Sequence, residues 1–115
     1  GEETRDWTYV EDAIDAFLAM CVKEEAVGES INVASGRETT VARMAEIVNE
    51  VTGNPAGIEY GPRRGWDCKE RLLASIDKAE EILDYQPVTR FRDGIVAANE
   101  WFSRHWELIL KSASF

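Results

Sequence analysis

The 115-residue chain has few of the residues that build metal sites and disulfide frameworks, with one histidine and two cysteines. The cysteines, Cys21 and Cys68, are far apart and form no Cys-x-x-Cys pair. With the lone histidine they give no zinc-ligand spacing, and the acidic residues follow no EF-hand pattern. We therefore expect no bound metal. Unpaired cysteines suit a reducing compartment, so the sequence favours a cytoplasmic location over a disulfide scaffold.

Long apolar runs and an excess of positive charge are also missing. No apolar run approaches the roughly 20 residues that span a bilayer, so we expect no membrane insertion. The formal net charge is -9 at pH 7, from 13 basic and 22 acidic side chains. Non-specific nucleic-acid binding needs a basic face that displaces counterions, so we expect no nucleic-acid partner. An anionic ligand would have to be held by a few chosen arginines.

Sequence signatures of nucleotide binding and of nucleophilic catalysis do not occur. No Gly-x-Gly-x-x-Gly follows a predicted strand, and there is no Gly-Lys-Ser/Thr of the phosphate-loop kind. His105, next to Trp106 in the last predicted helix, is interpreted as structural or solvent-facing rather than as a catalytic base. The sequence thus predicts neither a dinucleotide loop nor a catalytic triad.

Two helices are predicted in the first half of the chain. The first starts near Tyr9, with Thr8 and Glu11 as a capping box. Its expected buried face contains Val10, Ala13, Ile14, Phe17, Leu18 and Cys21. The second has Thr40 as its N-cap and Gly53 as its stop signal.

Two more helices are predicted in the second half. Ser75 is expected to cap a short helix that runs to about Leu83 and that Asp84 closes. The last helix runs from about residue 91 into the tail. Its expected buried face contains Phe91, Ile95, Ala98, Phe102 and Trp106.

Strands are predicted to be few and short. The alternating run at residues 30–34, Ser-Ile-Asn-Val-Ala, favours a strand, and residues 58–60 and 71–74 are further candidates. About four helices with two or three short strands predict a helix-rich mixed α/β fold, with residues 1–115 as a single unit. So small a sheet has an exposed edge that must pair with something.

Arginines remain as candidate ligand contacts. Arg5 precedes the first helix, whose N-terminus adds positive potential, while Arg63 and Arg64 lie in a Gly- and Pro-rich loop with Asp67 close by. A guanidinium binds phosphate oxygens bidentately, and glycines let a backbone approach a ligand. Two such arginines from distant segments form a possible diphosphate clamp, with the Asp67 carboxylate accepting hydrogen bonds from sugar hydroxyls. The alternative is that they are surface arginines that balance the charge of an acidic domain.

Five segments carry a family resemblance. They are residues 4–12 (TRDWTYVED), 28–36 (GESINVASG), 63–67 (RRGWD), 74–79 (ASIDKA), and the ending from 93–95 (DGI) to 101–102 (WF). In order and spacing the chain resembles the C-terminal part of the extended short-chain dehydrogenase/reductase family, the NAD-dependent nucleotide-sugar epimerases and dehydratases. The resemblance covers nearly the whole chain.

The resemblance implies a large NAD-binding Rossmann domain and a smaller substrate domain that completes the cleft for a nucleotide diphosphate sugar, of UDP or dTDP type. By analogy Arg5 and Arg63 contact the ligand's phosphates, and Arg64 is a second candidate because the doubled arginine blurs the register. Asp67 matches a ribose-hydroxyl ligand. The segment reads Arg-x-Gly-Trp-Asp, closer to the dehydratase-like Arg-Pro-Gly-His-Asp than to the epimerase-like Arg-Pro-Gly-Asp.

The family's glycine-rich loop and its Tyr-x-x-x-Lys catalytic pair do not occur in this chain. Tyr60 is followed four residues later by Arg64, and Tyr9 by Ala13. In the family the Tyr-Lys pair supplies the proton while NAD takes the hydride. We therefore expect the C-terminal, substrate-side portion of a two-domain isomerase or dehydratase, as a fragment or truncated gene product. Alone it should contain no catalytic residue, bind no NAD and show no turnover.

A second interpretation belongs to a different class. The chain would then be a stand-alone, non-catalytic binding or interaction module, a small homo-oligomer such as a homodimer that kept the substrate-domain scaffold. Self-association would cover its sheet edges and its four tryptophans.

Overall fold

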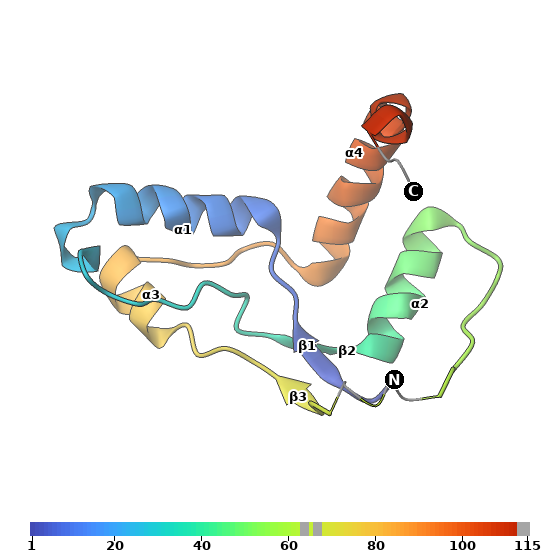
Figure 1. The fold of residues 1–115 in the computed structure, drawn as a ribbon, viewed down its shortest axis with the longest axis horizontal. Coiled ribbons are helices and arrows are strands. Elements are labelled where there is room, and N and C mark those ends of the chain that lie inside the picture. Colours follow the sequence, from blue (N-terminus) through green and yellow to red (C-terminus); the bar gives the residue numbers. More distant parts are fainter. Residues whose placement is uncertain (63–64, 66–67, 113–115) are drawn as a thin grey trace.

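The computed structural model describes residues 1–62, 65 and 68–112. Within these residues the fold consists of four α-helices, three short strands and one 3-10 turn, so the predicted helix-rich α/β class is confirmed (Figure 1). The helices are α1 (Val10–Val22), α2 (Val41–Thr52), α3 (Asp77–Leu83) and α4 (Phe91–Ser112). The strands are β1 (Thr4–Asp6), β2 (Glu38–Thr40) and β3 (Arg71–Leu72), and the 3-10 turn spans Glu24–Ala26.

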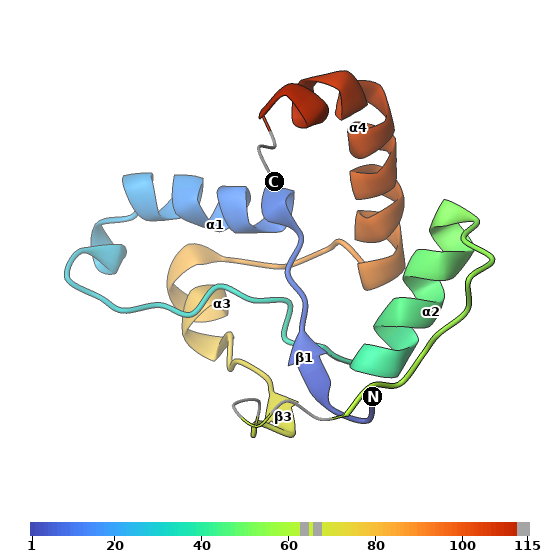
Figure 2. The ribbon, with the colours of Figure 1, turned by 45° about the vertical axis from the view of Figure 1, so that its right-hand side comes forward.

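The sheet has the strand order β2-β1-β3, with β1 in the centre. β1 runs antiparallel to β2 and parallel to β3. Arg5 therefore lies in the middle strand, paired with Thr39 on one side and with Leu72 on the other. In Figures 1 and 2 the sheet lies below α1 and close to the N-terminus of α2.

The prediction of strands at residues 30–34 and 58–60 is wrong, and β1 and β2 were not anticipated. Only the expectation for residues 71–74 is met in part, by β3. Residues 30–34 still pack against the core. Ile31 and Val33 contact it through their side chains, and the Tyr85 hydroxyl donates to the Ala34 carbonyl at 3.1 Å. Among the described residues, however, their backbone has no backbone hydrogen-bond partner. An alternating sequence becomes a strand only when another strand lies beside it.

Local end signals were confirmed at both ends of α2 and at the end of α3, where Asp84 is the C-cap, and were corrected at the starts of α1 and α3. The Thr40 hydroxyl accepts from the Arg43 amide at 3.1 Å, and Gly53 ends α2 in the left-handed region with φ 66°. α1 starts after Tyr9, without a side-chain cap, so the capping box at Thr8 is not formed. α3 starts after residue 76, and the Ser75 hydroxyl accepts only a long 3.4 Å bond from the amide of residue 77.

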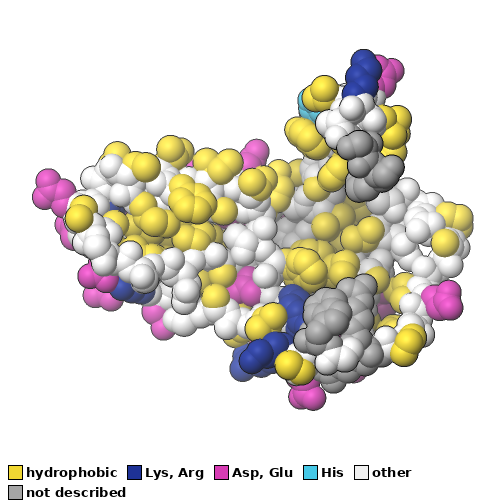
Figure 3. Space-filling model, viewed as in Figure 1, with side chains coloured by type: hydrophobic (Ala, Val, Ile, Leu, Met, Phe, Trp, Pro, Cys, Tyr) yellow, Lys and Arg dark blue, Asp and Glu magenta, His cyan; other side chains and the backbone are white. Residues whose placement is uncertain are grey.

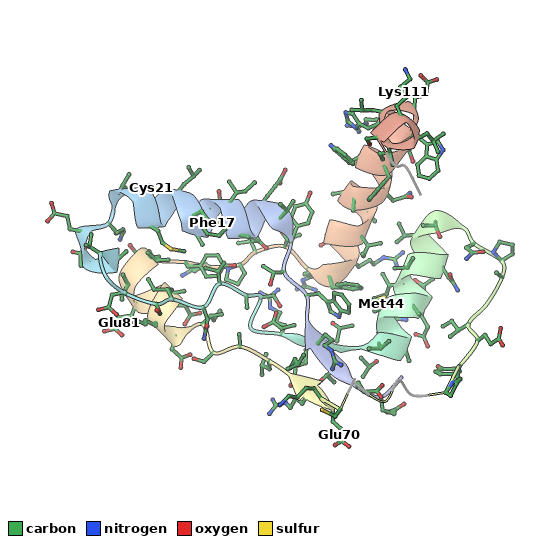
Figure 4. The ribbon with its side chains drawn as sticks, in the orientation of Figure 1. Phe17, Cys21, Met44, Glu70, Glu81 and Lys111 are labelled. Carbon is green, nitrogen blue, oxygen red and sulfur yellow. The ribbon has the colours of Figure 1, made fainter. Side chains whose placement is uncertain are left out.

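The apolar face predicted to be buried on α1 is exposed. Phe17 and Leu18 are each 61% exposed, and the other exposed members of the face are Val10, Ile14 and Cys21. The helix instead buries Asp12 and Ala16 and packs against α3. Figure 3 shows the apolar side chains of α1 at the surface, and in Figure 4 many of its side chains extend from the side away from α3.

The end of α4 is exposed in the same way. The first turns of α4 contact the rest of the molecule, since Gly94 lies against the Tyr9 ring and Arg92 binds Glu50 on α2 at 2.6 Å. The second half extends away from the body, with Lys111 at its far end (Figures 2 and 4). Phe102 and Trp106, which were expected to be buried, are 49% and 54% exposed. None of the described helices is both long and apolar enough to cross a membrane.

The core of the described chain is small. Its buried apolar residues are Ala16, Ala34, Ile47, Ala79, Leu83 and Tyr85. The accessible surface is 8701 Å², whereas a compact monomer of 13.0 kDa exposes about 6,300 Å². The radius of gyration is 16.9 Å, against about 13 Å for a compact domain of this length. The fold is open, and much of the surface left uncovered on α1 and α4 is apolar.

Candidate functional site

Arg5, the first of the predicted ligand contacts, lies in the central strand of the sheet, which precedes α1. Its side chain is partly buried, and its Nη1 donates to the carbonyl of Thr4 at 2.8 Å. Side chains alternate along a strand, so Arg5 shares one face of the sheet with Thr39 and Leu72. Thr4 and Asp6 point to the opposite face.

The other predicted contacts, Arg63, Arg64 and Asp67, lie outside the described residues. The structure does describe the strand that follows them. The Thr4 amide donates to the Glu70 carbonyl at 2.9 Å, and Arg5 is paired with Leu72 in the next strand. Glu70 lies at the edge of the sheet in Figure 4. The chain that leaves the predicted loop is thus bonded directly to the strand that carries Arg5.

A single carboxylate, Glu38, connects all three strands. One of its oxygens accepts from the Thr4 hydroxyl at 2.6 Å and from Arg71 Nε at 2.7 Å, and the other accepts from Arg71 Nη2 at 2.7 Å. The Arg71 pair, and then the Thr4 hydroxyl, lower the pKa of Glu38 to about 2. This cluster could not be predicted from the sequence, because Glu38 is one polar residue among several in the run Gly-Arg-Glu-Thr-Thr at residues 36–40.

The depressed pKa of Glu38 predicts a pH dependence. Because the folded-state pKa is about 2 and the usual value is 4.5, the stability that Glu38 contributes is present above pH 4.5 and is lost as the pH falls towards 2. A titration followed by NMR at the side-chain carboxyl carbon of Glu38 should have its midpoint near pH 2. Arg71→Ala should raise that midpoint towards 4.5, and Thr4→Val should raise it less. A wild-type midpoint near 4.5 would show that the cluster does not form.

Asp6 anchors the loop after the unpaired segment to β1. Its carboxylate accepts from the Ser35 amide at 2.9 Å, from the Ser35 hydroxyl at 2.5 Å and from the Gly36 amide at 3.0 Å. Gly36 has φ 66°, and a Cβ there would lie 3.0 Å from Ile76, so this loop position is suited to glycine. The aspartate beside Arg5 therefore holds the loop at residues 35–36 against β1.

Asp12 makes a comparable connection between α1 and the segment before α4. Its side chain is in the first turn of α1 and is only 4% exposed. It accepts from the Thr89 amide at 3.1 Å and from the Thr89 hydroxyl at 3.0 Å. Burial, and then the charges of Asp12 and Asp6, raise the pKa of Tyr85, which is buried nearby. Asp12 thus fixes the segment that leads into α4 against α1.

An open cavity of about 1110 Å³ lies between the loop at residues 35–39 and the segments 74–77 and 86–91. Its charged lining consists of Arg37, Arg90, Glu38, Asp77 and Glu80. Arg37 is already engaged, since its Nη2 donates to the Pro87 carbonyl at 3.1 Å. Three carboxylates against two guanidinium groups make this cavity a poor place for a diphosphate, which needs net positive charge.

The described strand-to-helix connections do not fit a dinucleotide. A pyrophosphate site of the Rossmann kind needs glycines between a strand and the N-terminus of the next helix. Trp7, Thr8 and Tyr9 connect β1 to α1, and β2 continues into α2 without an intervening residue. The described residues also contain no group of three or more His, Cys, Asp or Glu side chains placed to hold a metal ion.

Comparison with known proteins gives a consistent match. The family model described as GDP-mannose 4,6 dehydratase matches residues 1–97. The solved structure of the epimerase Mth375 from Methanothermobacter thermautotrophicus is 56% identical, with a TM-score of 0.94 over 100% of this chain and 34% of that one. The enzyme WbmF of Bordetella bronchiseptica, solved in complex with NAD+ and UDP, is 31% identical, with a TM-score of 0.77 over 96% of this chain and 32% of its own.

A UDP-glucose 4-epimerase of Mycolicibacterium smegmatis is 30% identical over 102 residues, which is 89% of this chain and 32% of that protein. The chain therefore spans about a third of the length of the relatives that it matches. The matched part contains β1 with Arg5 and all four helices, wholly or in part.

Proposed function

Because the chain belongs to the GDP-mannose 4,6 dehydratase family of NAD-dependent epimerases and dehydratases, we propose that it forms the C-terminal, substrate-side portion of such an enzyme. In this proposal residues 1–115 are one substrate-binding unit of a larger two-domain protein. The unit contributes contacts to the diphosphate and ribose of a nucleotide sugar. Proton transfer and the binding of NAD belong to the rest of the enzyme.

The open structure supports this assignment. The accessible surface is larger by about 2,400 Å² than that of a compact monomer of the same mass. The excess is accompanied by an uncovered apolar face on α1 and by an extended segment, residues 30–34, without backbone partners among the described residues. Both features are typical of a surface that packs against further protein.

The observation that carries the ligand assignment is the pairing of Arg5 with Leu72. It joins the strand of one predicted phosphate contact to the strand that follows the segment with Arg63, Arg64 and Asp67. Residues 5 and 72, which are distant in the sequence, are thereby brought to one sheet, and this supports a clamp with contributions from both segments. The complex of WbmF with UDP supports a nucleotide of this type as the ligand.

Calorimetric titration with UDP and with dTDP tests the clamp. The double variant Arg5→Ala/Arg63→Ala should bind UDP at least about 100-fold more weakly, because charge-assisted hydrogen bonds are worth roughly 1.5–3 kcal/mol each. Uridine has no diphosphate, so its affinity should not change between the two proteins. Arg43→Ala on α2, where Arg43 binds Glu46, is the matched control and should bind UDP like the wild type. Equal UDP affinity in the double variant and the wild type would rule out the clamp.

The second candidate, a stand-alone homo-oligomeric module, is favoured by the exposed aromatic half of α4. Trp101, Phe102 and Trp106 are each about half exposed there. A natural start codon just before residue 1, together with a dimer in solution, would support the module. An upstream reading frame that encodes the glycine-rich loop and the Tyr-x-x-x-Lys pair would support the two-domain enzyme instead.

A further inference from the structure

Three successive contacts connect Arg71, on the face of the sheet opposite Arg5, to the Arg5 guanidinium through Glu38 and Thr4. Glu38 accepts from the Thr4 hydroxyl at 2.6 Å, and the carbonyl of the same threonine accepts from Arg5 Nη1 at 2.8 Å. Arg71 completes the chain, since its guanidinium donates to both oxygens of Glu38 at 2.7 Å. Thr4 is thus held through its side chain and in turn holds the guanidinium of Arg5.

The geometry of this cluster is that of a rigid support. Glu38 is in β2, Thr4 in β1 and Arg71 in β3, so one carboxylate is bonded to the central strand and also to the strand on the other side of it. A bidentate arginine-carboxylate pair has a defined geometry, unlike a single flexible ion pair. The Glu38 side chain is 24% exposed, although Arg71 is 68% exposed, so the carboxylate is shielded more than its partner.

We propose that Glu38 is a positioning residue for Arg5, which it orients through Thr4, with Arg71 holding the carboxylate in place. The inference rests on the proposed function of Arg5 as a phosphate contact. A side chain as long as arginine loses rotamer freedom when it binds a ligand, and a guanidinium already held by the Thr4 carbonyl loses less of it. Glu38 therefore raises the affinity for the diphosphate without touching it.

The test is a set of UDP titrations with Glu38→Gln, Thr4→Val and the reciprocal exchange Glu38→Arg/Arg71→Glu. Glu38→Gln and Thr4→Val should each weaken UDP binding about tenfold, while uridine binding stays unchanged. The reciprocal exchange restores an arginine-carboxylate pair between β2 and β3 and should recover part of the affinity lost with Arg71→Glu alone. Glu46→Gln on α2, the same chemical change at a residue that pairs with Arg43, should have no effect.

The decisive measurement is the UDP affinity of Glu38→Gln in a protein that also carries Arg5→Ala. A positioning residue acts through Arg5, so Glu38→Gln should then cause less than about a twofold further loss of UDP affinity. A full tenfold loss in that background, or wild-type affinity in Glu38→Gln itself, would overturn the inference.

A measurement without nucleotide separates this inference from the proposed function. Amide hydrogen exchange at residues 4–6 should become faster in Glu38→Gln, and the reciprocal exchange should slow it relative to Arg71→Glu. Unchanged exchange in Glu38→Gln would refute the positioning role whether or not UDP binds. Absence of UDP binding to the wild type, with exchange altered as expected, would instead refute the assignment of Arg5.

Discussion

Asp12→Ala should lower the free energy of unfolding by about 3 kcal/mol, one of the two largest effects expected in this chain. Asp12 is 4% exposed, and its carboxylate accepts two hydrogen bonds from Thr89. Hydrogen bonds to a charged group are worth roughly 1.5–3 kcal/mol each, and the variant leaves the Thr89 amide without its acceptor. Urea denaturation followed by circular dichroism measures the loss. Asp15→Ala, an exposed aspartate on the same helix, is the control and should change the stability by less than about 0.5 kcal/mol.

Asp12→Asn should cost much less than Asp12→Ala, under about 1 kcal/mol. The Asn carbonyl can accept from the Thr89 amide, while its NH2 group donates to the Thr89 hydroxyl, which serves as donor or acceptor. Equal losses in Asp12→Asn and Asp12→Ala would contradict this account, because they would mean that the charge of the carboxylate, and not its capacity to accept from Thr89, stabilises the site.

The helices could be predicted because their signals are local. The hydroxyl of Thr40 and the positive φ of Gly53 act within one turn of the ends of α2, so four or five residues of sequence contain the information. The same reasoning failed at Thr8, where the cap falls one residue later at Tyr9. A side-chain N-cap is worth only about 1 kcal/mol, so the packing of the chain can outweigh it and move the start of a helix by one residue.

Strands and buried faces could not be predicted because they depend on partners. Residues 30–34 have a strand-like sequence but no backbone partner among the described residues, whereas residues 4–6 pair with two neighbours despite their polar sequence. The periodicity of α1 correctly identified an apolar stripe, and Phe17 shows that the stripe faces outward in this chain. The apolar periodicity of a helix indicates which of its faces is stabilised by burial, but it does not indicate which segment packs against that face.

In the candidate site, too, one part could be predicted from the sequence and another could not. Arg5 was singled out by side-chain chemistry, and the structure adds that it sits in the central strand. The carboxylates that organise its surroundings were not identified, since their partners lie far away in the sequence: Asp6 and Ser35 are 29 residues apart, and Glu38 and Arg71 are 33 apart. Pairings over such separations are set by the tertiary fold alone.

Asp6 differs from Asp12 in the chemistry of its partners, and this difference makes the second large prediction. Its two oxygens face two backbone amides, at Ser35 and Gly36, in addition to the Ser35 hydroxyl. An asparagine can place its carbonyl towards only one of these amides, and its NH2 group then meets the other N–H, donor against donor. Asp6→Asn should therefore lower the free energy of unfolding by about 2–3 kcal/mol, nearly as much as Asp6→Ala.

The comparison of the two asparagine variants is the sharpest test of these anchors, because the chemical change is the same in both. Urea denaturation should show a severe loss for Asp6→Asn and a mild one for Asp12→Asn. Ser35→Ala removes the hydroxyl that donates to Asp6 and accepts from the Arg37 amide, and it should cost about 1.5 kcal/mol, less than Asp6→Asn, since both amide bonds to Asp6 remain. Equal stability of the two asparagine variants would mean that the loop at residues 35–36 is not held by its amides. The link between β1 and the segment at residues 30–34 would then have to come from packing, through Ile31, Val33 and the Tyr85 ring.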